Sequence, residues 1–579
     1  MVSLVRRQVR RQRYWYLVES GRVNGRPRIV WQKYLGTPQR IRELLEKAEA
    51  GGGPLEVDVA DFGPAPLLAL AHELGLVETI DRLIPKRDQG YSVGEHLLIA
   101  ILNRCIAPCS KLQIRPWFDE TILPRLLGKK EGLSSQDYWN HLDRLDDGLI
   151  EAIQFALSRR AVERFGLDLD FLYYDPTNFS THIQAHDDRG NEIPERGPAK
   201  DHRTDLRRIG VALLASRDHG VPLLHRTFPG NQSEYPLFRE EVPRIRRWVE
   251  ALGKRPEEVT LIFDKGNNSQ PGLDLVEGAG LHYVGSLRPS LNRDLLTLPL
   301  ARFRPCYGEG ETATLTYREK RRAYGREVTL VMTFNRQLEA HLRATLEDIL
   351  VTAEERLRAW ATALAEDPAK GRSRGRRTLA TCQNRVRKLL GRAEPLFRWT
   401  VAREGRGPFE VQWTRDEAAI RRRGLGFGRT LIYTDRHDWS DEEIVRAYRS
   451  KAVIEEEFRR LKDTSYLADT PQYPWTDSKI KGHQLICFLA LQLMTILQRQ
   501  LHRTGHAVTI DELAHALQRW FQVIQLYPGG KIERRLRPMS PVQETLHKEF
   551  HLEVYAGTPG ADKTVGNTLG IRETPSEKG

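Results

Sequence analysis

The stretch Asp170-Phe171-Leu172-Tyr173-Tyr174-Asp175-Pro176 has the apolar run of a short buried strand, which we expect to end at the Asp-Pro pair. Outward from it, two further apolar runs, Ile209–Ser216 and Val221–Thr227, flank the turn residues Asp218-His219-Gly220. Two β-rich runs around a glycine-containing turn predict a hairpin. The region therefore begins as one strand followed by a hairpin.

The elements after this hairpin indicate the fold class. Leu237–Leu252 has apolar residues at helical spacing, and Val259–Phe263 is a second short apolar run that ends in Asp264. Strand, hairpin, helix and strand is the opening order of a ribonuclease H-like fold, a mixed α/β sheet flanked by helices. We therefore expect an α/β catalytic domain of this type.

A third carboxylate of interest lies in the helical stretch Tyr448-Arg449-Ser450-Lys451-Ala452-Val453-Ile454-Glu455-Glu456-Glu457-Phe458-Arg459-Arg460-Leu461-Lys462. At about 100° per residue, Tyr448, Lys451, Glu455 and Lys462 share a stripe roughly 60° wide. The apolar residues of the stretch form an adjoining stripe that can pack on a sheet. On the same count Glu457 points away, into solvent, so the geometry selects Glu455 from the three glutamates.

Composition narrows the class of protein. The 579 residues include 90 Lys+Arg and 77 Asp+Glu, a formal net charge of +13, which suits a polyanionic partner or a soluble enzyme that is merely basic. With 29% charged residues we expect no membrane bundle, and the longest apolar stretch, Leu485–Leu497, is shorter than the ~20 residues that a bilayer requires. The N-terminal residues are rich in arginine where a secretory signal would have an apolar stretch, so we expect no such signal. Five cysteines indicate a reducing cytoplasm, and Cys105 and Cys109 are only a weak zinc candidate.

The distribution of apolar, charged and turn-forming residues along the chain predicts seven regions. Tyr14-Trp15-Tyr16-Leu17-Val18 and Ile29-Val30-Trp31 flank an Asn-Gly turn, which predicts a hairpin that contacts DNA or caps a larger domain. The predicted regions are a basic β-hairpin region (1–50), a helical N-terminal domain (55–165), the first part of the core (166–300), an insertion domain (301–430), the last part of the core with the Glu helix (431–500), a helical C-terminal region (501–555) and a disordered tail (556–579). Gly424, Gly426 and Gly428 are read as a loop before a strand rather than a phosphate loop.

Each acidic residue also has a structural interpretation. Asp175 suits a turn before Pro176, Asp264 a turn before Gly266, and Glu455 an ordinary Glu–Lys helical pair. Carboxylates at strand ends can, however, converge at one sheet edge and bind hard divalent cations through oxygen. The three together, in this order and on these elements, favour a metal site.

These residues resemble those of DDE insertion-sequence transposases. Tyr448, Lys451, Glu455 and Lys462 match the Tyr-(2)-Arg-(3)-Glu-(6)-Lys signature, with Lys where that family has Arg. Further stretches resemble the family's two aspartate segments, the sequence after its second hairpin strand and other parts of this branch: Tyr174–Thr177, Phe263–Gly266 (with Asn268 in place of the common aromatic), Phe228–Asn231, Gly197–Asp205 and Trp475–His483. The long gap between Asp264 and Glu455 looks like the β-rich insertion that this branch carries within its catalytic domain.

The resemblance implies a two-metal transposase. Asp175 would bridge two Mg²⁺ ions, with Mn²⁺ expected to substitute, and Asp264 and Glu455 would each complete one coordination shell. Water would free a 3′-hydroxyl at the element end, which then attacks target DNA. Tyr448, Lys451 and Lys462 would contact terminal phosphates, and Asn231 and His483 are near-site candidates that also suit structural roles. Further expected DNA-binding residues are Arg459, Arg6, Arg7, Arg10, Arg11 and Arg13.

The expected partners are the terminal inverted repeats and target DNA, bound as double strands by a homodimer in the cytoplasm, associated with the nucleoid and not with membrane. Two alternatives stay open. One is a DNA-binding protein derived from such a transposase without cleavage activity, and the intact acidic trio counts against it. The other is a structure-specific nuclease of the same fold, which the insertion and the Tyr-Lys-Glu-Lys pattern disfavour.

Overall fold

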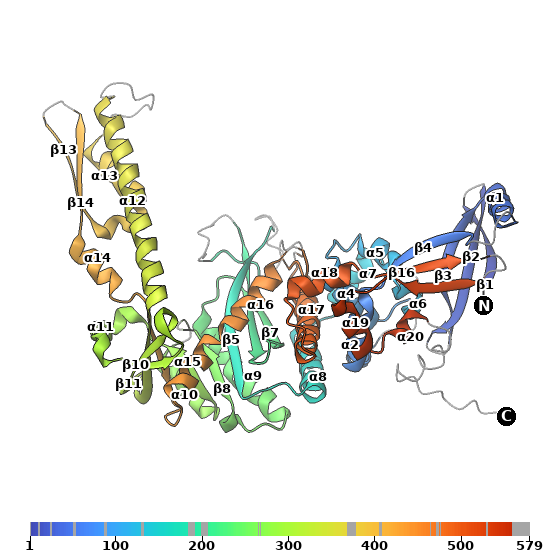
Figure 1. Cartoon of the computed structure of the whole chain (residues 1–579), viewed down its shortest axis with the longest axis horizontal. Coiled ribbons are helices and arrows are strands. Elements are labelled where there is room, and N and C mark those ends of the chain that lie inside the picture. The colour runs from blue at the N-terminus through green and yellow to red at the C-terminus, as the bar shows by residue number, and fades with distance from the viewer. Residues whose placement is uncertain are drawn as a thin grey trace. The chain divides into compact units, whose positions relative to one another are not determined.

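The computed structural model describes the chain except for residues 1, 10–11, 24–25, 50–53, 86–89, 129–131, 183–191, 198–205, 265, 267, 367–377, 405–407, 464, 470–473, 475, 528–530 and 558–579. The predicted disordered tail therefore lies outside the described residues except for Ala556 and Gly557. The chain forms a mixed α/β protein of two compact units: unit 1 comprises Met1–Leu261 and Ser450–Gly579, and unit 2 comprises Ile262–Arg449 (Figure 1). The predicted core segments 166–300 and 431–500 are each divided between the two units.

Two small antiparallel sheets form one part of unit 1. The first has strand order β1-β2-β3 and the second β17-β16-β4, so the second joins a strand near the N-terminus to the hairpin β16–β17 from the region predicted to be helical. The bounds are β1 Val2–Val9, β2 Gln12–Val23, β3 Arg26–Gly36, β4 Glu56–Asp61, β16 Phe521–Leu526 and β17 Ile532–Leu536. The predicted 14–36 hairpin is present as β2–β3, but the arginine run adds β1 as a third strand.

Helix α1, Pro38–Glu49, follows β3 and packs on it. A helical layer comes next, within the region 55–165, and its helices are α2 Pro64–Glu73, α3 Leu76–Leu83, α4 Val93–Ile106, α5 Ile114–Glu120, α6 Leu123–Leu127, α7 Ser135–Leu142 and α8 Asp147–Phe165. Helix α7 starts after Ser134, whose side chain accepts a hydrogen bond from the Asp137 amide in a capping box. The C-terminal helices of unit 1 are α18 Ile510–Gln518, α19 Pro541–Glu549 and α20 Glu553–Ala556.

The long helix α17, Asp477–Arg503, is the central core element of unit 1. It contacts α4, α7 and α2 on the helical side and strand β7 on the sheet side. By length and composition it is the one described helix apolar enough to cross a membrane, but 94% of its most apolar window is buried within the unit. Such burial is what the core helix of a folded domain shows, and it explains the apolar stretch Leu485–Leu497.

The main sheet of unit 1 has the strand order β8-β5-β6-β7, with bounds β5 Phe171–Ser180, β6 Arg208–Ser216, β7 Pro222–Pro229 and β8 Thr260–Phe263, the last divided between the units. The predicted hairpin around His219 is confirmed as β6–β7. Helix α9, Glu234–Ala251, and helix α16, Ala452–Lys462, pack on β5 from opposite faces. Tyr174 contacts Phe238 of α9 at 5.5 Å between ring centroids, and its strand neighbours contact α16.

Unit 2 contains the strand order β10-β11-β12-β15-β9-β8. Its elements are α10 Gln270–Gly278, β9 His282–Ser286, α11 Arg293–Leu296, β10 Arg304–Tyr307, β11 Thr314–Ala323, β12 Arg326–Asn335, α12 Arg336–Glu366, α13 Leu379–Leu390, β13 Phe397–Arg403, β14 Phe409–Arg415, α14 Glu417–Gly424, β15 Arg429–Thr434 and α15 Asp441–Arg449. Because β12 pairs with β15, the strands at the start of the predicted 301–430 insertion extend this sheet.

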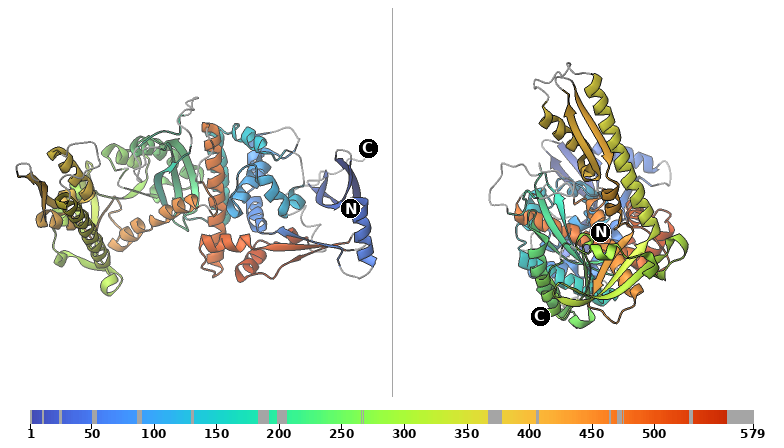
Figure 2. Two further views of the ribbon diagram at one scale, coloured as in Figure 1. Left: turned by 90° about the horizontal axis from the view of Figure 1, so that it is seen from above. Right: turned by 90° about the vertical axis from the view of Figure 1, so that its left-hand side faces the viewer.

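The rest of the predicted insertion has a core of its own. The 31-residue helix α12 lies beside the β13–β14 hairpin and α13 (Figure 2). Leu357, Val386 and Val411 belong to one buried cluster there, with Trp413 packed against it. Gly424 ends α14, whereas Gly426 and Gly428 lie in the turn between α14 and β15, and Gly428 takes a positive φ of 71°.

Candidate functional site

Asp175 lies inside strand β5, not at its end. The pairing with β6 continues without a register shift from Leu172 to Ser180, and Asp175 is opposite Leu213. The predicted strand end at Pro176 is therefore wrong. Proline has no backbone N–H. It therefore fits in a strand at a position where that N–H would not have bonded to a neighbouring strand. Asp175 is half-buried.

The face of β5 that carries Asp175 is the face on which α16 packs. Successive strand residues point to opposite faces, so Tyr173, Asp175 and Phe179 share one face. The Tyr173 hydroxyl lies 2.5 Å from the Ser450 hydroxyl, just before α16. At the other end, Phe179 lies 6.5 Å from the ring of Phe458 in α16.

These two contacts lie on either side of the two carboxylates. Asp175 lies between Tyr173 and Phe179 on β5, and Glu455 lies between Ser450 and Phe458 along the chain. Both carboxylates therefore belong to the stretch in which α16 packs on β5.

Glu455 itself is accessible. Its side chain is 64% exposed, and its Oε1 lies 3.2 Å from Nζ of Lys451, whose side chain is 9% exposed. Oxygen ligands on an accessible carboxylate, beside a second half-buried carboxylate, fit a hard divalent cation such as Mg²⁺. The donor set of unit 1 is thus compatible with the predicted metal.

The remaining glutamates of α16 correct one prediction. Glu457 is fully buried and does not face solvent. It forms a hydrogen-bonded ion pair with Arg460, and the turn at Gly220 covers it together with Val453. Burial raises the pKa of Glu457 to about 8. The helical-wheel count was wrong because α16 packs on two surfaces, the β5 face and the β6–β7 turn, whereas the count assumed one.

The predicted continuous helix from Tyr448 to Lys462 is also interrupted. Helix α15 ends at Arg449 and α16 begins at Ala452. Between them the amide of Val453 bonds to the carbonyl of Ser450, which is the tighter i to i+3 pattern. Tyr448 therefore belongs to α15 in unit 2, whereas Lys451, Glu455 and Lys462 belong to unit 1.

Lys462 and Arg459 differ in their local partners. Lys462 is exposed and its Nζ lies 5.0 Å from the centroid of the Phe179 ring. Arg459 is exposed and forms two hydrogen bonds with Glu456, of 2.7 and 2.6 Å. A phosphate contact from Arg459 would have to replace those bonds.

Asp264 lies in unit 2 and directly follows the last residue of β8, as predicted. The loop after it is held by Asn268, which donates to the carbonyl of Ser286 and accepts from the Tyr433 hydroxyl at 2.7 Å. The Tyr448 hydroxyl donates to the Ser286 hydroxyl at 2.8 Å. Ser286 thus connects the loop after Asp264 to the tyrosine of the signature. The sequence signal for this network is the asparagine at 268 in place of an aromatic residue.

The two near-site candidates, Asn231 and His483, differ in burial. Asn231 is exposed in the turn after β7. His483 is buried in α17, with its Nε2 3.5 Å from Asp469.

Arg6 and Arg7 lie in β1 and Arg13 in β2, where the register places Arg6 opposite Trp15 and Arg7 opposite Tyr14. Arg10 and Arg11 lie outside the described residues, as do all eight residues 198–205 that follow Gly197.

The N-terminal sheet β1-β2-β3 packs on the rest of unit 1. Lys33 pairs with Glu56 and Asp58 of β4, at 3.2 and 3.4 Å, and Arg534 of β17 pairs with Glu19. Tyr14 and Tyr16 contact Tyr34, which is 51% exposed. The hairpin therefore both docks on the domain and displays an aromatic face.

All five cysteines are free, as expected for a chain without a disulfide scaffold. Cys105 donates to the Ala490 carbonyl and Cys109 to the Asn103 side chain. These separate partners give no support to a zinc site between the two cysteines. Among the described residues, the one group of three or more potential metal ligands is Asp469, His483 and Cys487.

Comparison with known families decides the class of the protein. The family model described as "Transposase DDE domain" matches residues 175–473, more than half of the chain. The chain belongs to the transposase DDE domain family. The matched range begins at Asp175 and includes both Asp264 and α16.

Two further comparisons accompany this transposase family assignment. The chain is similar to a cryo-EM structure of a piggyBac transposase synaptic complex with hairpin DNA, at 10% sequence identity and a TM-score of 0.36, over 89% of this chain and 86% of that chain. No curated protein matches the chain.

Proposed function

We propose that this transposase binds the ends of an insertion sequence, cleaves DNA phosphodiesters and joins the 3′-hydroxyl ends to target DNA. We further assign it to the branch with the Tyr-(2)-Arg-(3)-Glu-(6)-Lys signature, with a ribonuclease H-like core and an insertion between the second aspartate and the glutamate. The observation that carries the proposal is that Asp175 and Glu455 both belong to the stretch in which α16 packs on β5, within the range matched by the family model.

The cofactor proposed is Mg²⁺, with Mn²⁺ as a substitute, held by Asp175, Asp264 and Glu455. When bound, such ions activate the attacking oxygen and neutralise charge on the leaving oxygen. The protein's own contribution is to orient the carboxylates. Lys451, 3.2 Å from Glu455, holds that side chain in place, and the packing of Phe179 on Phe458 fixes α16 against β5.

Cations around α16 supply the proposed contacts with DNA. Lys462 is exposed beside Phe179, and its ammonium group is the proposed contact with a phosphate of the terminal nucleotides. Lys451, Tyr448 and Arg459 are proposed as further contacts. Phosphate contacts of this kind position DNA without reading its sequence.

The N-terminal sheet is proposed as a second DNA-binding surface. The sheet displays an exposed tyrosine, Tyr34, and the sequence of this region contains arginines at positions 6, 7, 10, 11 and 13. Aromatic faces and cations together suit nucleic acid. Because two element ends are joined in one event, we propose that the DNA complex contains a homodimer, acting in the cytoplasm on nucleoid DNA.

Parallel binding and cleavage assays test the proposal on a labelled end duplex with Mg²⁺. Asp175→Asn and Glu455→Gln remove one proposed ligand each while keeping size, so cleavage should fall by several orders of magnitude and end binding should persist. Glu456→Gln is the matched control, because Glu456 neighbours Glu455 on α16 but pairs with Arg459. Cleavage by Asp175→Asn at the wild-type rate would reject the metal assignment. A wild-type protein that binds ends without cleaving them would support the binding-only alternative.

A further inference from the structure

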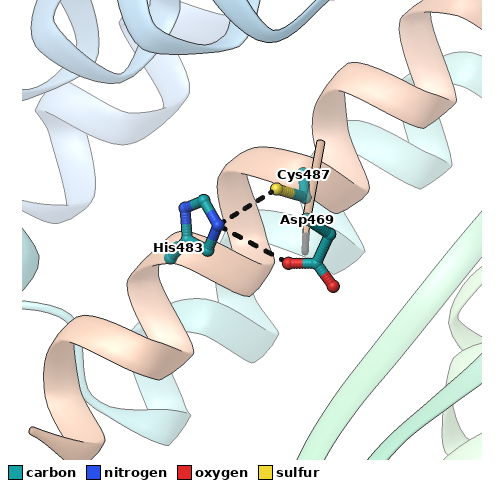
Figure 3. A group of neighbouring side chains, drawn as sticks. All are labelled: Asp469, His483 and Cys487. Carbon is teal, nitrogen blue, oxygen red and sulfur yellow. Dashed lines mark hydrogen bonds and ion pairs between the residues drawn. The ribbon is translucent and has the colours of Figure 1, made fainter. Parts of the chain in front are cut away.

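Three buried side chains converge beneath the C-terminal end of α16, apart from the proposed catalytic carboxylates. Asp469 belongs to the segment that follows α16, and His483 and Cys487 lie one turn apart on α17 (Figure 3). Asp469 and Cys487 are fully buried and His483 is 4% exposed. One potential ligand atom from each lies within 4.8 Å of the other two.

The two contacts that His483 makes within this group share a single ring nitrogen. Nε2 of His483 lies 3.5 Å from Oδ1 of Asp469 and 3.7 Å from Sγ of Cys487 (Figure 3). A catalytic Cys–His–Asp relay requires the acid and the nucleophile on different ring nitrogens, so this arrangement does not suit one. A single Nε2 carries either one proton or one lone pair, and therefore cannot hydrogen-bond well to both neighbours.

A metal ion between the three atoms would satisfy all of them. In tetrahedral zinc sites the Zn–S, Zn–N and Zn–O bonds are about 2.3, 2.0–2.1 and 2.0–2.2 Å. Such bonds separate neighbouring ligand atoms by about 3.3–3.6 Å at tetrahedral angles. The separations of Nε2 from Oδ1 and from Sγ, 3.5 and 3.7 Å, are close to those edges. A thiolate, an imidazole and a carboxylate together select zinc over Mg²⁺.

The surrounding groups set the charges of the ligands. Burial lowers the pKa of His483 well below its ordinary value, which keeps the imidazole neutral, as a metal ligand must be. Burial and the neighbouring Asp469 carboxylate raise the pKa of the Cys487 thiol, and Arg104 and Lys111 lower it by less, so the thiol would release its proton when the ion binds. The carboxylate and the thiolate would balance the two charges of the ion. Gln484 donates to Oδ1 of Asp469 at 2.7 Å and so orients the carboxylate.

The position of the group gives such an ion a structural task. The Asp469 amide donates to the carbonyl of Leu461 in the last turn of α16, at 3.1 Å. Leu467 and Ala468, just before Asp469, both take positive φ angles, of 59° and 44°. Non-glycine residues adopt this conformation at a cost that the surroundings must offset. A ligand bond to Asp469 would offset it and connect the end of α16 to α17.

We propose that Asp469, His483 and Cys487 bind one zinc ion, which fastens the end of the Glu455 helix to the core helix α17. The site is distinct from the carboxylates proposed for Mg²⁺. Three protein ligands leave the fourth position of a tetrahedron to a water molecule.

Metal analysis of the purified full chain, without DNA or Mg²⁺, tests this proposal separately from the proposed catalytic function. We expect one zinc per chain. After removal of zinc, Co²⁺ should give the sulfur-to-cobalt charge-transfer band and the ligand-field bands of a four-coordinate site. Cys487→Ser should abolish the charge-transfer band, and His483→Gln should weaken zinc affinity by more than about 100-fold, beyond the loss of a second-shell partner.

Cys105→Ser is the matched control, because Cys105 is also a fully buried thiol but bonds to the Ala490 carbonyl. It should retain zinc and the cobalt spectrum. Wild-type protein that binds neither zinc nor Co²⁺ would overturn the proposal without any variant having to fold. A cobalt spectrum without the sulfur band, or one that Cys105→Ser removes, would also contradict it. Hydrogen exchange gives a second readout, since added zinc should slow exchange of the amides in 465–469.

Discussion

The packing of α16 on the β6–β7 turn leads to a quantitative prediction for Gly220. A Cβ atom at this position would lie 2.2 Å from Cγ1 of Val453 and 3.1 Å from Oε1 of Glu457, both on α16. Gly220 also has a φ of 67°. Gly220→Ala should therefore combine about 1–2 kcal/mol of left-handed backbone strain with about 1–3 kcal/mol of overpacking.

Gly253→Ala separates these two contributions. Gly253 has a similar φ of 73°, but nothing lies within 4 Å of a Cβ at that position. Only the strain applies there, so Gly220→Ala should be the more destabilising by about 1–3 kcal/mol. Because the overpacking acts on α16, its effect should be local to that helix.

Hydrogen exchange measures this difference at the residues concerned. The amides of Ala452–Lys462 should exchange about 5- to 150-fold faster in Gly220→Ala than in Gly253→Ala, which corresponds to 1–3 kcal/mol of local opening free energy. DNA cleavage should fall in Gly220→Ala alone, because Glu455 lies on this helix. Equal exchange of α16 in the two variants would refute the reasoning that the β6–β7 turn holds the Glu455 helix.

Three further predictions follow from particular side chains. Lys462→Ala should weaken binding to end DNA, measured by gel shift, and should make the slope of log affinity against log salt shallower by about 1. The control is Lys320→Ala, because Lys320 is exposed but paired with Glu327. An equal change in Lys320→Ala would argue against a specific contact by Lys462. For Glu457, whose pKa rises from 4.5 to about 8 on folding, the protonated form favours the folded state, so its contribution to stability is full below pH 4.5 and is lost as the pH rises to about 8. The thermal midpoint of wild type relative to Glu457→Gln should therefore decrease over that range, and a constant difference would contradict the burial argument. Deletion of residues 1–40 should weaken end binding, whereas unchanged affinity at fixed salt would assign the N-terminal sheet a purely structural role.

Local chemistry allowed several elements to be predicted from the sequence. The hairpin turn at His219 and the strand end before Asp264 each depend on residues within a few positions of the feature. The apolar residues Ile454, Phe458 and Leu461 of α16 are buried as the helical spacing predicted. In these cases the pattern along the chain already contains the physical cause.

Other features depend on partners far away in the sequence. Glu457 is buried because the distant β6–β7 turn covers it. A helical wheel considers α16 alone and therefore cannot predict a contact with that turn. Strand β5 continues past Pro176 because β6 pairs with it as far as Ser180. Strands β16 and β17 form a sheet with β4, which lies more than 450 residues earlier in the chain. Tertiary pairing of this kind overrides local propensity.

The central claim is that Asp175, Asp264 and Glu455 form one metal site in the working protein. The most direct measurement is the anomalous scattering of Mn²⁺ in crystals of the full chain bound to end DNA. The account predicts two ions about 4 Å apart, as in other two-metal sites, with all three carboxylates among their ligands. A structure in which any two of these carboxylates lie more than ~10 Å apart, beyond the reach of such an ion pair, or in which Mn²⁺ binds elsewhere, would contradict it.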